Sequence, residues 1–257
     1  MPYRSSNFTH FPLSPFCRTH PTYLMITYPF WNVPVRIELR DAQKPYLRKH
    51  VANLPAGLLK TFLPRPLLFY AFQQRSRDWI LPLYLPSLTH AADIEIPALR
   101  ALFAHMAHLL DQPLYWNHLP KHASLEEGVL LYRALRILRL DHAAQDVGAL
   151  LAQEMKARPV NAAEAQCVWH AFCLTHERDR WLRLLLNNIA YFDGFRRQGE
   201  GEYVLMVVEG ELHKLEIEEQ RRIVDIYREF WEMHRGSESG GRRREQEGRR
   251  RWCRGGL

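Results

Sequence analysis

The sequence predicts an α+β fold that is predominantly α-helical, with a small sheet in its first third. Two patterns lead to this expectation. Thirteen of the sixteen prolines precede Leu99, and proline blocks helix interiors, so this part should hold short strands, turns and short helices. From Leu99 to Phe192 the apolar residues instead recur every three or four positions, which is typical of amphipathic helices.

Two strands and one helix are expected in the proline-rich third. Residues 35–40 alternate strictly between apolar and charged side chains, which predicts a half-buried strand. Residues 46–62 have apolar positions at helical spacing and predict a helix that is interrupted around Pro55. Residues 79–85 predict a second strand, which should lie near a sheet edge because Pro82 cannot donate a ladder hydrogen bond.

The middle of the chain predicts five helices, over residues 98–110, 123–140, 142–159, 161–174 and 179–192. Ser124 and Glu127 form a capping box at the start of the second helix, and Asn161 with Glu164 repeats this pattern at the fourth. The second helix is apolar on more than one face, so it should lie at the centre of the core. Further on, residues 203–210 fit either a strand or a helix, and 211–234 predict a last amphipathic helix.

The net charge of +7 is concentrated at the C-terminus. Residues 235–257 hold eight Arg and three Glu, a net +5, which leaves only +2 for the rest of the chain. This tail has few apolar residues to bury and is expected to be disordered. The four cysteines are scattered, and neither an 18-residue apolar run nor a signal-peptide stretch is present. We therefore expect an intracellular protein, nuclear or cytoplasmic, that does not enter the membrane.

No sequence motif for hydrolase, nucleotide-binding or metalloprotease chemistry is present. His105 and His108, and also His118 and His122, have spacings that can bring two imidazoles to one metal ion. No carboxylate or cysteine completes either pattern, so surface or structural roles for these histidines are favoured over a metal site. We expect no catalytic, cofactor-binding or metal-binding residues, no small-molecule substrate and no enzymatic activity.

Four stretches of the chain, taken in order, resemble the divergent BTB/POZ-domain proteins of filamentous fungi. Residues 35–54 look like the family's opening strand and the helix that carries its H-x-x-x-L, here His50 and Leu54. The other three are similar to a later strand with its helix, to the paired helices that close the domain, and to a helical extension; they are residues 79–106, 130–155 and 168–192. Leu58 departs from the pattern, because the family usually has Ser there.

The resemblance implies a small sheet capped by a helical bundle, followed by a helical C-terminal extension. The expected organisation is a Pro- and aromatic-rich leader (1–34), a BTB/POZ-like domain (35–158), the extension (159–234) and the disordered Arg-rich tail (235–257). The implied function is protein–protein interaction: self-association, adaptor or scaffold work, or recruitment to a ubiquitin ligase scaffold. The family has no catalytic residues to carry over to this chain.

Two segments are candidate binding sites. Phe30 and Trp31, beside the first predicted strand, could pair with a partner protein or with a second copy of the chain, or could simply cover the protein's own core. The tail suggests an alternative function, a nuclear regulator that binds nucleic acid through phosphate contacts and stacking. A nuclear-import signal, or a solvated end without function, fits the tail equally well. Its candidate residues are Arg242, Arg243, Arg244, Arg249, Arg250, Arg251 and Trp252.

Overall fold

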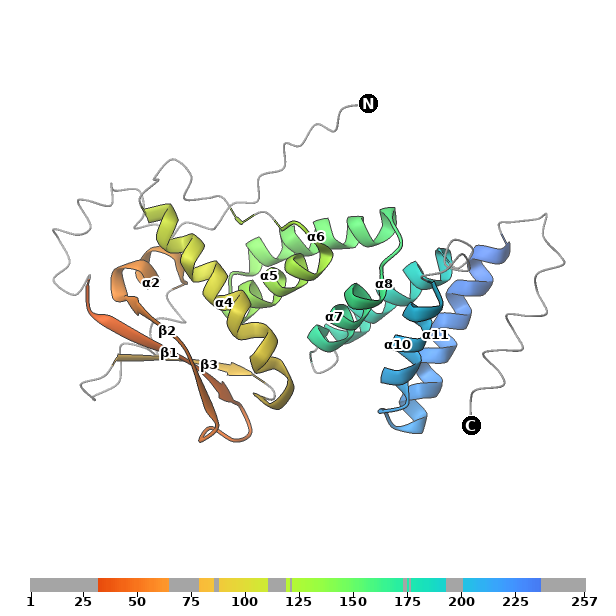
Figure 1. Cartoon of the computed structure of the whole chain (residues 1–257), viewed down its shortest axis with the longest axis horizontal. Helices are drawn as coiled ribbons and strands as arrows, with labels where there is room; N and C mark the ends of the chain where they lie inside the picture. Colours follow the sequence, from red (N-terminus) through yellow and green to blue (C-terminus); the bar gives the residue numbers. More distant parts are fainter. Residues whose placement is uncertain are drawn as a thin grey trace, which may run out of the picture. The chain divides into compact units, whose positions relative to one another are not determined.

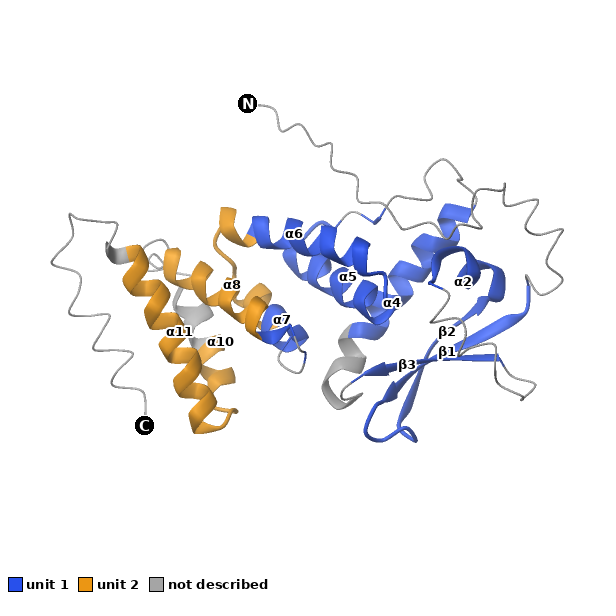
Figure 2. Ribbon diagram, turned by 180° about the vertical axis from the view of Figure 1, so that it is seen from behind, with its two compact units in different colours: residues 1–154, 167–178 blue, residues 155–166, 179–257 orange. Residues whose placement is uncertain are grey.

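The computed structural model describes residues 32–64, 79–85, 88–110, 119–120, 122–172, 175, 177–192 and 201–236. These residues are mostly helical and include one three-stranded sheet (Figure 1), which confirms the predominantly helical α+β prediction. The chain divides into two compact units, coloured separately in Figure 2. The first comprises residues 1–154 and 167–178, and the second comprises residues 155–166 and 179–257.

The sheet belongs to the first unit and has the strand order β2-β1-β3. Its strands are β1 (Pro34–Asp41), β2 (Arg48–Pro55) and β3 (Trp79–Leu85). β1 pairs antiparallel with β2 and parallel with β3. The two strands predicted from the sequence are therefore confirmed, and β3 lies at an edge of the sheet as Pro82 indicated.

The helix predicted over residues 46–62 is wrong for its first half. Residues 48–55 form β2, and only Ala56–Phe62 is helical, as α2. His50 and Leu54, assigned to a helix by the resemblance, therefore lie on a strand. Pairing with β1 overrides the local pattern, because Ala52 faces Ile37 and Leu54 faces Val35 across the ladder.

Among the described residues, the helices of the first unit are α2, α4 (Leu88–Leu110), α5 (Leu125–Ile137), most of α6 (Asp141–Ala157) and the end of α7 (Ala162–Phe172). Three of them, α2, α4 and α5, contact the sheet. α4 contacts β1 and β2, while α5 contacts β3 and α4 (Figure 1). α4 begins ten residues earlier than the sequence predicted, with Pro97 inside the helix. Burial of Leu99 and Leu102 offsets the hydrogen bond that this proline removes.

Both predicted capping boxes are confirmed. At α5, Ser124 Oγ accepts a hydrogen bond from the Glu127 backbone N–H at 3.2 Å, and the Glu127 carboxylate accepts one from the Ala123 N–H at 2.8 Å. At α7, Asn161 Oδ1 accepts from the Glu164 N–H at 2.8 Å, and Glu164 returns the bond at 2.9 Å. Each box satisfies backbone donors that the first helical turn leaves open.

α5 is buried on more than one face, as its wide apolar surface predicted, and it packs closely against α6. Val129 and Leu135 are fully buried, and Tyr132 is 2% exposed. The Tyr132 ring lies against Gly148 of α6, so closely that a Cβ added at Gly148 would come within 2.8 Å of the ring. The ring is held by a hydrogen bond from its hydroxyl to Glu177 (2.7 Å) and by an edge contact with Phe172.

In its described residues, the second unit contains three further helices, α8 (Arg178–Tyr191), α10 (Gly201–Leu212) and α11 (Ile217–Gly236). Residues 203–210, which the sequence left open between strand and helix, are helical in α10. The buried Asn188 of α8 fixes the segment that follows α6: its amide donates to the carbonyls of Met155 and Arg158, and its Oδ1 accepts from the Val160 N–H at 3.1 Å. Ile223 and Tyr227 bury the inner side of α11.

Candidate interaction surface

The candidate site is the face of the sheet that points away from the helices. Because side chains alternate along a strand, β1 places Val35, Ile37 and Leu39 on the inner face, where all three are fully buried. The intervening residues are then on the outer face: Arg36, Glu38 and Arg40. The central strand of the sheet therefore carries a row of three charged residues on one side.

Glu38 is held between the two arginines of this row. The Arg36 Nε lies 3.0 Å from Glu38 Oε1, and the Arg40 Nε and Nη2 lie 3.2 and 2.9 Å from Glu38 Oε2. The Glu38 side chain is 6% exposed, whereas those of Arg36 and Arg40 are 40% and 18% exposed. The carboxylate is thus covered, and what the row presents to solvent is chiefly guanidinium.

β2 adds further polar side chains to the outer face through a β-bulge. The register places Ala52 opposite Ile37 but His50 opposite Glu38, so β2 has one extra residue, Val51. The Arg100 Nε of α4 donates to the Val51 carbonyl at 2.8 Å, which supplies a partner to the bulged residue. As a result Val51 is buried, while His50 is exposed on the same face as Glu38.

Arg48 and Asn53 complete the β2 side of this face. Arg48 pairs with Arg40 in the ladder and is exposed. Asn53 pairs with Arg36, and its Oδ1 lies 3.2 Å from His50 Nε2, which is possible because the bulge brings residues 50 and 53 to the same side. The β2 side is therefore open, with one arginine directly beside Arg40.

On the β3 side of the outer face, two residues are buried and one aromatic side chain is exposed. Ile80 and Pro82, opposite Arg36 and Glu38, are both buried. Tyr84, opposite Arg40, is 55% exposed. We call this set of outer-face residues the arginine face; it consists of the covered Glu38 and of the exposed or half-buried Arg36, Arg40, Arg48, His50, Asn53 and Tyr84. With His neutral, its three arginines and one glutamate give a net charge of +2.

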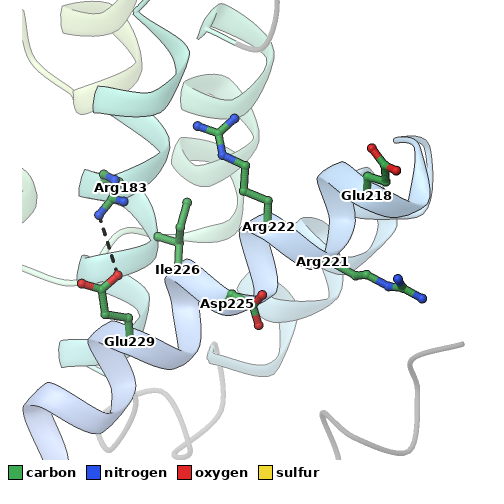
Figure 3. Close-up of a pocket in the computed structure, with 7 residues that line it drawn as sticks. All are labelled: Arg183, Glu218, Arg221, Arg222, Asp225, Ile226 and Glu229. Carbon is green, nitrogen blue, oxygen red and sulfur yellow. Dashed lines mark ion pairs between the residues drawn. The ribbon is translucent and has the colours of Figure 1, made fainter.

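A groove in the second unit is a weaker candidate. It has a volume of about 520 Å³ and is lined by Arg183 of α8 and by Glu218, Arg221, Arg222, Asp225, Ile226 and Glu229 of α11 (Figure 3). Three of these residues are basic and three are acidic. Arg183 and Glu229 point toward one another, 3.9 Å apart, and Arg222 pairs with Asp179 at 2.5 Å. Its charges are balanced, so the groove favours neither a cationic nor an anionic ligand.

The candidate residues predicted from the sequence lie outside the described residues. This holds for Phe30 and Trp31 and for the tail set Arg242–Arg244 and Arg249–Trp252. His105 and His108 lie on α4, and within the described part of the chain no group of His, Cys, Asp or Glu is arranged to hold a metal ion.

Part of the arginine face could have been predicted from the sequence pattern that indicated β1. The alternation that predicted β1 also assigned Arg36, Glu38 and Arg40 to one face. The contributions of β2 could not be derived in this way. They depend on the bulge at Val51, and a one-residue insertion in a strand has no periodicity of its own.

No family model, curated protein or solved structure matches this chain. Among the described helices, none has the length and apolar character needed to cross a membrane.

Proposed function

We propose that the protein is a non-enzymatic protein–protein interaction module with an adaptor or scaffold role. The observation that carries the proposal is the arginine face. Arginine and tyrosine are the side chains most enriched, with tryptophan, among residues that dominate binding energy at protein interfaces. Here three arginines and Tyr84 share one face of a short sheet, and the bulge that positions the β2 residues is fixed by Arg100.

The order of elements supports a BTB/POZ-like assignment as part of this proposal. A strand opens the domain as β1, a later strand is followed by a long helix as β3 and α4, and a helix pair follows as α5 and α6. Further helices, α7 and α8, stand where the resemblance expects an extension. In this proposal the protein acts in the nucleus or cytoplasm, by self-association or by bringing a partner to a larger assembly.

Light scattering and affinity capture test the interaction proposal. Sizing of the full chain over a range of concentrations is compared with the Phe30→Ser/Trp31→Ser variant. Self-association through the leader should give a mass that rises with concentration in the wild type and falls back to the monomer in the variant. A chain that stays monomeric at high micromolar concentration, and that captures no protein beyond those retained by an unrelated control, would refute the module.

Nucleic-acid binding through the tail is the alternative function, favoured by the eight arginines in residues 235–257. Contacts of this kind neutralise phosphates, so binding should weaken steeply with salt and ignore sequence. Changing the six arginines 242–244 and 249–251 to serine should then abolish binding to a duplex probe. Undiminished binding by that variant would place any nucleic-acid site outside the tail.

A further inference from the structure

We propose that the arginine face docks an extended acidic segment of a partner protein, one with two carboxylates four residues apart. The inference rests on the proposed interaction function and names the partner's chemistry. Its basis is the set of three arginines on one face of the sheet, of which Arg36 and Arg40 already enclose the carboxylate of Glu38. The face carries a net charge of +2, and the charge still open to solvent is entirely cationic.

The guanidinium groups have donors to spare. Among the described residues, the Arg36 side chain has an ion pair with Glu38 through its Nε, at 3.0 Å, but donates no hydrogen bond. Arg40 uses its Nε and Nη2 on Glu38. The Arg48 side chain is exposed and has no hydrogen bond or ion pair within the described part of the chain. A planar guanidinium with a free edge binds a carboxylate through two parallel hydrogen bonds.

The spacing of the row defines the pattern of the ligand. Arg36 and Arg40 are four residues apart on one strand, which is roughly 13 Å at the rise of a β-strand. An extended peptide running along β1 has the same rise, so carboxylates at positions i and i+4 can reach both arginines. The position between them, i+2, lies over Glu38, where a third carboxylate would meet a like charge.

The same geometry favours a protein ligand over a nucleic acid. A phosphate backbone carries charge at every residue and binds best to an uninterrupted basic surface. Glu38 interrupts this surface at its centre, and a net +2 is small for phosphate binding. Tyr84, 55% exposed beside Arg40, adds the aromatic contact typical of a protein interface.

Fluorescence anisotropy with labelled peptides tests the proposal on the full-length chain. The first probe is a nine-residue peptide of Thr and Val with Glu at its third and seventh positions. The second has the same composition with Glu at its third and fifth positions, and a third probe is a twelve-nucleotide oligothymidylate. The test variant is Arg48→Glu, because the exposed Arg48 side chain makes no bond to the described residues that the fold would lose. The matched control is Arg221→Glu, the same charge change at an exposed position of α11.

We expect the first peptide to bind more tightly than the second, and Arg48→Glu to raise its Kd about tenfold, which corresponds to ~1.4 kcal/mol. Arg221→Glu should leave that Kd within a factor of two. Both variants should keep the thermal unfolding midpoint of the wild type, and Arg48→Ala should show an intermediate Kd.

Several results would overturn the inference: no binding of the first peptide, equal binding of the two peptides, or equal weakening by both charge reversals. Loss of peptide binding when only the tail arginines 242–244 and 249–251 are changed to serine would move the contact to the tail. Oligothymidylate binding that is stronger than peptide binding, and sensitive to Arg48→Glu, would identify a nucleic-acid surface instead. If the peptides fail but the wild type still self-associates or captures a partner, the interaction module stands and uses another surface.

Discussion

A buried ion pair between α4 and α5 allows a quantitative test of how the first unit is held together. The side chains of Glu95 and Arg133 are 4% and 10% exposed. The Arg133 Nε and Nη2 both donate to Glu95 Oε1, at 3.1 and 2.5 Å. Glu95 Oε2 is buried without a hydrogen-bond partner among the described residues. The pair is therefore desolvated but incompletely satisfied.

Removing one partner should cost much more than removing both. Arg133→Met leaves the Glu95 carboxylate buried without its partner, and Glu95→Leu does the same to the Arg133 guanidinium. Each single substitution is expected to lower the free energy of unfolding by about 3–5 kcal/mol. In the double variant no charge is buried, and the orphaned Oε2 disappears as well. The double variant should therefore recover most of the loss, to within about 1 kcal/mol of the wild type or above it.

The measurement is urea unfolding followed by far-UV circular dichroism, with the four proteins of a double-mutant cycle at pH 7. Arg228→Met is the control, because Arg228 pairs with Asp225 on the exposed surface of α11, where an ion pair contributes at most about 1 kcal/mol. The reasoning would be refuted if each single variant lost less than about 1 kcal/mol of unfolding free energy. It would also be refuted if the double variant were no more stable than the less stable of the two single variants.

The same pair predicts a pH dependence. Burial raises the pKa of Glu95 above 4.5, and the opposing charge and hydrogen bonds of Arg133 only partly counteract it. Folded Glu95 then binds its proton more tightly than in the unfolded chain. Its contribution to stability therefore increases as pH falls through the folded pKa towards 4.5, and decreases as pH rises. The Glu95→Leu/Arg133→Met variant should lack this component of the pH profile.

Four further substitutions test other parts of the structure. Ser124→Ala should cost about 0.5–2 kcal/mol through the lost cap, and Leu135→Ala about 2–5 kcal/mol through the cavity; a silent Leu135→Ala in urea would contradict the core position of α5. Asn188→Ala should cost about 3 kcal/mol or more, since it leaves two carbonyls and one N–H of a buried segment without partners; hydrogen exchange at Val160 should accelerate, and an unchanged rate would count against the contact. Burial alone would raise the pKa of Glu164, but bonds from Arg158 and Asn161 outweigh it and lower the pKa. Glu164→Gln should therefore destabilise at neutral pH, with a deficit that shrinks as pH falls through the folded pKa; a pH-independent deficit would exclude this linkage.

Local signals in the sequence were sufficient to place the starts of α5 and α7. Both capping boxes depend on residues three apart, and the structure places their hydrogen bonds as the pattern indicated. β2 could not be recognised, because its identity depends on pairing with β1 and its bulge hides the alternation. The β2 side of the arginine face could not be predicted either, because Arg48 and His50 lie on this face only in the register in which β2 pairs with β1.

The contact of Gly148 with Tyr132 limits how this sequence can diverge. A methyl group at position 148 would meet a ring that cannot move aside, because Glu177 holds its hydroxyl and Phe172 its edge. The two positions must then change together: a larger residue at 148 requires a smaller one at 132, which would in turn leave Glu177 without its phenol. A chain descended from a common ancestor should therefore keep this glycine and this tyrosine as a pair, even where its surface has changed completely.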